Sequence, residues 1–140
     1  MSLENLVGIS LEKVRPDADM IQRLICAAER NLCDARVTSI SPENRFDAAY
    51  KAIMQLSSAA LLANGFRTLT SKPGHHMTMI QTLRQTIGLD MQSVIVLDAL
   101  RKQRNVADYS GDTIPESTVV ECISRAECLF EHVKLWMGER

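Results

Sequence analysis

Polar side chains that could do chemistry gather near the end of a helix that we predict from Asp90 to Tyr109. At about 100° per residue, they continue the face on which Val94 and Leu97 lie. The polar candidates are Arg101, Arg104, Asn105, Asp108 and Tyr109. A core-facing apolar stripe is therefore expected to become polar toward its end. Polar groups in that position need internal hydrogen bonds, a partner or a ligand.

The residue types of this cluster suit a phosphate or RNA site. Arginine supplies a planar fork of donors that matches a phosphate group. Asparagine both donates and accepts hydrogen bonds, and a tyrosine can donate one or stack. The alternative is a structural network, in which Arg104 and Asp108 pair across one helical turn. An exposed pair of that kind contributes only about 0.3–0.5 kcal/mol.

Two histidines follow Pro73-Gly74, where we predict a helix from His75 to Ile87. The helix dipole at this end disfavours a protonated imidazole and favours bound anions. The two side chains are either ordinary first-turn residues, or one of them reaches the Arg104 cluster. We take His76 as the further binding candidate, whereas His132 in the last predicted helix is expected to be structural.

Other familiar catalytic or metal-binding patterns do not occur in the sequence. There is no nucleophile elbow, no HExxH pair and no glycine-rich phosphate loop. The cysteines lie seven and six residues apart in two pairs, spacings that match neither a zinc knuckle nor a redox pair. We expect no metal and no cofactor. The cysteines (Cys26, Cys33, Cys122 and Cys128) and the methionines Met77, Met79 and Met91 are expected to be core residues.

Apolar residues at three–four spacing predict an all-α, up-and-down bundle of about five helices. The first two predicted helices begin at Pro16-Asp17 and Ser41-Pro42, and the second ends at Asn64-Gly65. The others run over 75–87, 90–109 and from Ile114-Pro115 to about 137, and 66–74 is expected to be a loop. Residues 94–97 would suit a strand on their own, but nothing else in the sequence offers a partner strand. We predict an N-terminal extension over 1–15, flexible or packed, and one helical domain over 16–138.

The stretch R104-N-V-A-D-Y109 resembles the signature helix of the HEPN superfamily, the higher eukaryotes and prokaryotes nucleotide-binding domains. The segments 46–67 and 71–83 are similar to the second helix and the following loop and helix of that family. The resemblance covers about residues 17–137 and includes the helix order. It implies a HEPN-like homodimer in which the arginines of two protomers line a shared cleft. It further implies RNA or a nucleotide as ligand, and a nucleotidyltransferase-like antitoxin as partner.

The sequence departs from the toxin members of that family at one place. Their motif arginine holds phosphate and a histidine four to six residues further on moves protons, without a metal. Here Tyr109 stands where that histidine is expected. A phenol, with an unperturbed pKa near 10, is a poor general base at neutral pH. Family members without the histidine are thought to bind nucleotides or partners.

Our main hypothesis is therefore a non-catalytic HEPN-like domain. It would bind RNA, a nucleotide phosphate or a partner protein in a toxin–antitoxin or defence system. One alternative is a metal-independent endoribonuclease toxin in which Tyr109 or His76 replaces the usual histidine. The other is a purely structural helical subunit, with the Arg104 cluster stabilising the bundle.

Composition limits how such a domain could bind nucleic acid. The 140 residues carry a net charge of -1, which excludes binding by bulk electrostatic attraction. Any phosphate contact must be local and geometric. No apolar run approaches the roughly 18 residues of a membrane span. We therefore expect no membrane contact, and the cysteine spacings, which predict no disulfide, favour a cytoplasmic protein.

Overall fold

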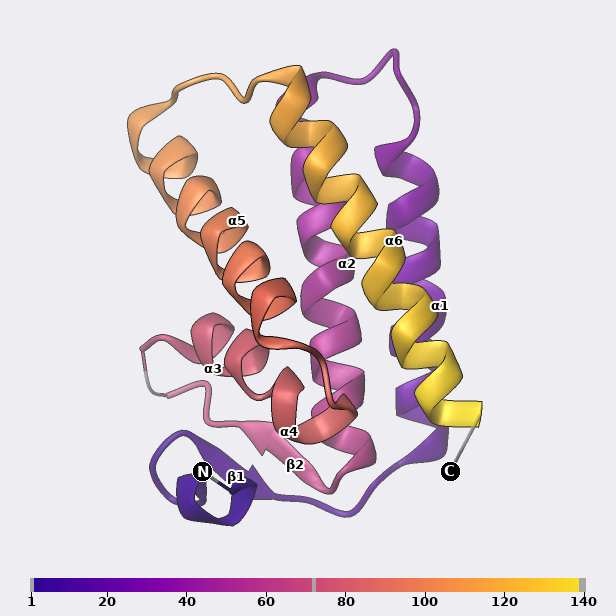
Figure 1. Cartoon of the computed structure of the whole chain (residues 1–140), viewed down its shortest axis with the longest axis vertical. Helices are drawn as coiled ribbons and strands as arrows, with labels where there is room; N and C mark the ends of the chain where they lie inside the picture. Colours follow the sequence, from indigo (N-terminus) through magenta and orange to yellow (C-terminus); the bar gives the residue numbers. More distant parts are fainter. Residues whose placement is uncertain (1, 72, 139–140) are drawn as a thin grey trace.

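The computed structural model describes residues 2–71 and 73–138, and it is an all-α helical bundle with one small sheet (Figure 1). Its helices are α1 (Ala18–Ala35), α2 (Pro42–Ala63), α3 (His75–Gln81), α4 (Leu83–Ile87), α5 (Met91–Ser110) and α6 (Glu116–Gly138). A single 3-10 turn at Leu3–Leu6 precedes them. The predicted fold class, an all-α bundle, is confirmed. The prediction of about five helices also holds, since α3 and α4 follow each other directly and together replace one predicted helix.

Side-chain caps explain where the helices begin. The Asp17 carboxylate accepts hydrogen bonds from the first backbone N–H groups of α1. Ser41 Oγ accepts from Asn44 N at 3.2 Å, and Asp90 Oδ2 accepts from Ser93 N at 2.9 Å. These contacts satisfy N–H groups that have no partner within the helix. Since the cap residues are recognisable in the sequence, the predicted starts of α1, α2 and α5 are confirmed.

The helix predicted over 75–87 is divided at Thr82. The buried Thr82 hydroxyl donates to the carbonyl of Thr78 at 2.8 Å and also lies 3.2 Å from the carbonyl of Met79. A hydroxyl that bonds back to the preceding turn competes with the backbone ladder and bends helices. The chain then forms the short α4, and Gly88 follows its last residue as the cap, with φ +68°.

The helix α2 forms the centre of the bundle, packed against α1 and α6 and touched by α3 and α5. Most of its residues are buried, and several are alanines that let neighbouring helices approach closely. These buried alanines are Ala49, Ala52, Ala59, Ala60 and Ala63. Because α2 is surrounded, polar side chains on it must be satisfied by the helices that cover it.

The expectation of a loop over 66–74 is wrong for its first residues. Strand β2 (Phe66–Thr68) pairs antiparallel with β1 (Leu11–Lys13) from the N-terminal extension. Leu11 is fully buried, and Arg67 forms an ion pair with Glu12 in the opposite register position. The extension therefore packs on the bundle through β1. Two three-residue strands leave little pattern in a sequence, because only their pairing makes them a sheet.

The cysteines and methionines are less buried than expected. Cys122 is buried, but Cys33 and Cys128 are exposed, and all four cysteines are free thiols. Met79 is buried, whereas Met77 and Met91 are exposed. The core expectation is thus wrong for these exposed residues, because they lie on helix faces that no neighbour among the described residues covers. No helix in the described part of the chain has the length and apolar character that crossing a membrane requires.

Candidate functional site

The site forms where the inner side of α5 meets α2 and the start of α3. The guanidinium of Arg104 lies over the ring of Tyr50, with 4.9 Å between Cζ and the ring centroid. Tyr50 is buried, and burial raises the pKa of its hydroxyl to about 12 although Arg104 and Arg101 oppose that rise. The ring therefore stays neutral. A cation over a neutral aromatic face is stabilised by about 0.5–2 kcal/mol.

Two carboxylates flank the same guanidinium at longer range. Asp47 Oδ1 lies 3.8 Å from Arg104 Nε, and Asp108 Oδ2 lies 3.8 Å from Arg104 Nη2. Both distances exceed those of hydrogen bonds. Arg104 Nε is buried and has no hydrogen-bond partner among the described residues. The side chain is therefore oriented by its neighbours while its donors remain uncommitted.

Two other partly or fully buried arginines are bonded differently. Arg101 Nε donates to Asp98 Oδ1 at 2.8 Å. Arg45 donates to the carbonyl of Ala35 and to Glu116, both at 2.8 Å. Each of these side chains has a close acceptor for its buried charge. Arg104 differs from both in making no such bond.

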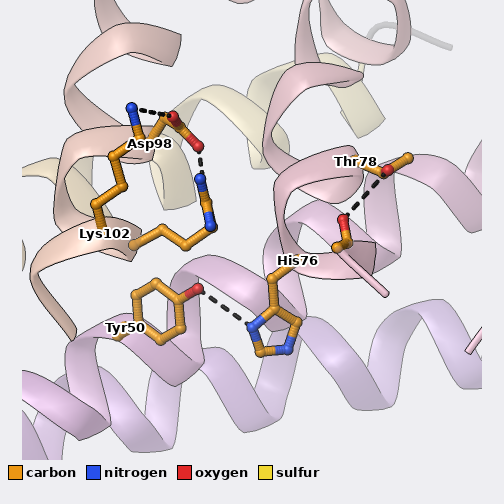
Figure 2. A network of polar contacts seen from close by, with 7 residues as sticks. Tyr50, His76, Thr78, Asp98 and Lys102 are labelled. Atoms are coloured by element: carbon orange, nitrogen blue, oxygen red, sulfur yellow. Dashed lines mark hydrogen bonds and ion pairs between the residues drawn. The ribbon is translucent and has the colours of Figure 1, made fainter. Parts of the chain in front are cut away.

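His76 joins the site through Tyr50. Figure 2 shows the two side chains pointing toward each other, with 3.2 Å between Tyr50 Oη and His76 Nδ1. Burial lowers the pKa of His76, and His75, Arg104 and Arg101 lower it further. The imidazole is therefore neutral at neutral pH. It can accept a hydrogen bond from the Tyr50 hydroxyl at Nδ1 and carry its own proton on Nε2.

A second ion-pair group lies next to the site on α5. Besides bonding Arg101, Asp98 lies 3.6 Å from Lys102 Nζ through its other carboxylate oxygen (Figure 2). Arg101 is half-buried and its charge is compensated by Asp98. Arg101 is thus close enough to influence the pKa of His76, but its Nε is already used.

The structure brings four of the six predicted site residues to one place. Arg104 and His76 contact Tyr50, Asp108 flanks Arg104, and Arg101 lies close enough to act on the pKa of Tyr50. Asn105 is exposed, and Tyr109 is 92% exposed with no contact to this cluster among the described residues. The expectation that Tyr109 continues the core-facing stripe is wrong. Tyr109 lies about 140° around the helix from Arg104, and α5 diverges from α2 toward this end (Figure 1).

Two residues of the site were not predicted, and both come from α2. Tyr50 lies on the buried side of α2, where a tyrosine hydroxyl usually needs a partner. Asp47 gave no signal, because only the packing of α5 on α2 places it near Arg104. Burial raises the pKa of Asp47; Arg104 opposes this rise, Asp108 adds to it and Lys51 opposes it.

His132 and the remaining acidic residues do not extend the site. His132 Nε2 donates to the carbonyl of Ile87 at 2.9 Å, which is the structural role expected for it. Within 2–71 and 73–138, no group of three or more His, Cys, Asp or Glu side chains is arranged to hold a metal. No family model matches this sequence, and no curated protein matches it either.

Proposed function

We propose that this chain is a HEPN-like helical domain that binds the phosphate of RNA or of a nucleotide at Arg104 without cleaving it. The observation that carries the proposal is the state of the Arg104 side chain. Its guanidinium is held on the Tyr50 ring, yet it makes no hydrogen bond within the described residues. An arginine oriented in advance loses less entropy when it binds, and its planar fork suits a phosphate oxygen pair.

The carboxylates beside Arg104 affect which anions can bind there. Asp47 and Asp108 together exceed the single positive charge of Arg104, so an anion binds here only if it takes the place of a carboxylate at the guanidinium. A phosphate that accepts two parallel hydrogen bonds from the guanidinium makes a stronger contact than either 3.8 Å ion pair. The site therefore favours a phosphate group over a simple halide, consistent with selective rather than bulk electrostatic binding.

The direct test is binding of a fluorescent RNA oligonucleotide measured by anisotropy. Loss of charge-assisted hydrogen bonds worth about 1.5–3 kcal/mol should weaken binding at least about tenfold in Arg104→Ala. Arg125→Ala is the matched control, because the ion pair of Arg125 among the described residues is with Glu121 in its own helix, α6. Competition by a nucleotide and by inorganic phosphate distinguishes the ligand sources. Equal RNA binding by the unchanged chain and Arg104→Ala contradicts the proposal.

A specific observation favours one alternative, an endoribonuclease that uses His76. The Tyr50 ring connects His76 and Arg104, and the lowered pKa of His76 keeps it neutral and able to take a proton. Tyr109 is the weaker substitute, because it is exposed and distant from Arg104 on the helix. Cleavage of RNA in the presence of a chelator that disappears in both His76→Ala and Arg104→Ala would establish the enzyme. Tyr109→Phe tests, in the same assay, the other residue proposed to replace the usual histidine.

The remaining alternative is a structural subunit. It predicts that Arg104→Ala lowers the melting temperature and changes no binding at all. The toxin–antitoxin or defence role and a nucleotidyltransferase-like antitoxin partner are proposals that rest on the sequence resemblance alone. A neighbouring gene for such a nucleotidyltransferase, and co-purification of the two products, would support them.

A further inference from the structure

A groove of about 580 Å³ lies between the first half of α5 and the helices α3 and α4, and Arg104 does not line it. We call it the α5 groove. Met91, Ile95 and Ala99 are four residues apart on one face of α5, and with Val94 they form its apolar lining. Met91 is 47% exposed and Ile95 54%. Ligand pockets typically have about 300–1,000 Å³ and a mostly apolar lining with a few polar groups. The α5 groove has both properties.

The charged side chains of the α5 groove leave one cation unpaired. Asp98 is its one carboxylate within the described residues, and it is already used by two cations. Asp98 lies 2.8 Å from Arg101 Nε and 3.6 Å from Lys102 Nζ. Arg84 on α4 is exposed and lines the same groove, and its side chain has no ion pair or hydrogen bond in the part of the chain that the structure describes. The groove therefore offers a guanidinium without a counter-ion beside an apolar floor.

We propose that the α5 groove binds an amphipathic carboxylate, such as a fatty acid, with its apolar chain along α5 and its carboxylate at Arg84. A guanidinium can donate two parallel hydrogen bonds to a carboxylate. Such a ligand supplies the charge that Arg84 lacks and covers the exposed faces of Met91 and Ile95. A neutral or cationic ligand of the same shape would leave Arg84 without a counter-ion. The charge of the groove thus favours an acid.

The dimensions and flexibility of the floor suit a linear chain. From Met91 to Lys102, α5 rises by about 16 Å, because a helix rises 1.5 Å per residue. An extended decanoate chain is shorter than this span. Met91 is unbranched and can adjust its shape to different apolar ligands. At the Lys102 end the ammonium group already faces Asp98, so the carboxylate is expected at Arg84 instead.

This binding site is independent of the proposed phosphate site. None of Arg104, Tyr50, Asp47, Asp108 and His76 lines the α5 groove. Decanoate and RNA should therefore bind the same chain without competing. Displacement of RNA by decanoate would place the carboxylate at Arg104 and overturn the assignment to the groove.

Isothermal titration with decanoate, below the concentration at which it forms micelles, tests the charge. We expect one decanoate per chain, and weaker binding of decanol and of decyltrimethylammonium. Arg84→Gln should weaken decanoate binding by about threefold or more, as loss of a partly exposed ion pair does, and leave decanol binding unchanged. Arg30→Gln is the matched control, because Arg30 is likewise exposed, on α1, and has no side-chain partner among the described residues.

A second pair of variants tests the apolar floor. Ile95→Glu puts a carboxylate in the groove and should abolish decanoate binding. Val120→Glu on α6 is its control, because Val120 is 55% exposed and lies outside the groove. Circular dichroism checks that every variant stays folded. The proposal is overturned by absence of saturable decanoate binding, by equal binding of the three ligands, or by unchanged binding in Arg84→Gln or Ile95→Glu.

Discussion

The Arg104 guanidinium lies 4.9 Å above the ring of Tyr50 and thereby joins α5 to the buried centre of α2. The ring is neutral, because burial raises the pKa of the Tyr50 hydroxyl to about 12. The same hydroxyl lies 3.2 Å from His76 Nδ1. Tyr50 is therefore the residue that orients both the cation and the imidazole of the proposed site.

Substituting Tyr50 separates the role of its ring from that of its hydroxyl. We expect Tyr50→Phe to keep the guanidinium in place and to leave RNA affinity within about threefold, since the aromatic face remains. Tyr50→Leu removes that face, so affinity should fall by about tenfold. Anisotropy titrations of both variants measure this. If both substitutions weaken binding equally, the ring does not orient Arg104.

Neutralising Asp47 should strengthen phosphate binding. Its pKa lies above the usual value, mainly because of burial, so it gains a proton earlier than other aspartates as the pH falls. Loss of that charge leaves Arg104 flanked by Asp108 alone. RNA affinity of the unchanged chain should therefore rise as the pH falls from neutral toward the raised pKa of Asp47.

The matched variant is Asp47→Asn, which keeps the shape and removes the charge. It should bind more tightly at neutral pH and lose the Asp47 contribution to the pH dependence. Titrations at several pH values measure both effects. Weaker binding by Asp47→Asn at neutral pH would mean that Asp47 helps to hold the ligand, contrary to this prediction.

His76 should make the fold less stable in acid. Its folded pKa lies below the unfolded value, so the unfolded chain binds more protons as the pH falls below about 6.5. The stability due to neutral His76 is complete above that pH and is lost as the pH falls toward the lowered folded pKa. The melting temperature of the unchanged chain should therefore fall between about pH 7.5 and about pH 5, and it should fall less in His76→Gln. Thermal melts at both pH values measure this. His75→Gln should also reduce the drop, but less, because His75 is one of the groups that lower the pKa of His76 and burial is the larger cause.

Arg45 should matter far more to stability than its ion-pair partner. The Arg45 side chain is buried between the end of α1 and the start of α6, while the Glu116 carboxylate is largely exposed. Arg45→Ala leaves the Ala35 carbonyl without its donor and opens a cavity, so we expect a loss of about 2–4 kcal/mol. Glu116→Gln should cost less than about 1 kcal/mol. Urea unfolding of the two variants measures both values, and equal losses would contradict this assignment.

Much of the helical architecture could be predicted from the sequence. The caps at Asp17, Ser41 and Asp90 and the glycine after α5 are local features, so they mark helix ends without knowledge of the fold. The three–four spacing of apolar residues indicated which faces are buried. The position of Arg104 on the inner side of α5 follows from the same periodicity.

The rest depends on contacts between segments that are distant in the chain. The packing of α5 on α2 decides that Asp47 and Tyr50 surround Arg104, and it decides that Tyr109 does not. The pairing of β1 with β2 likewise exists only once the extension lies beside residues 66–68. The sequence by itself determined the helices and the residue types available for a phosphate site, because these depend on local hydrogen bonds and periodicity. Only the tertiary structure decided which residues meet and which face of α5 stays uncovered, because burial and distance are set by how the helices pack.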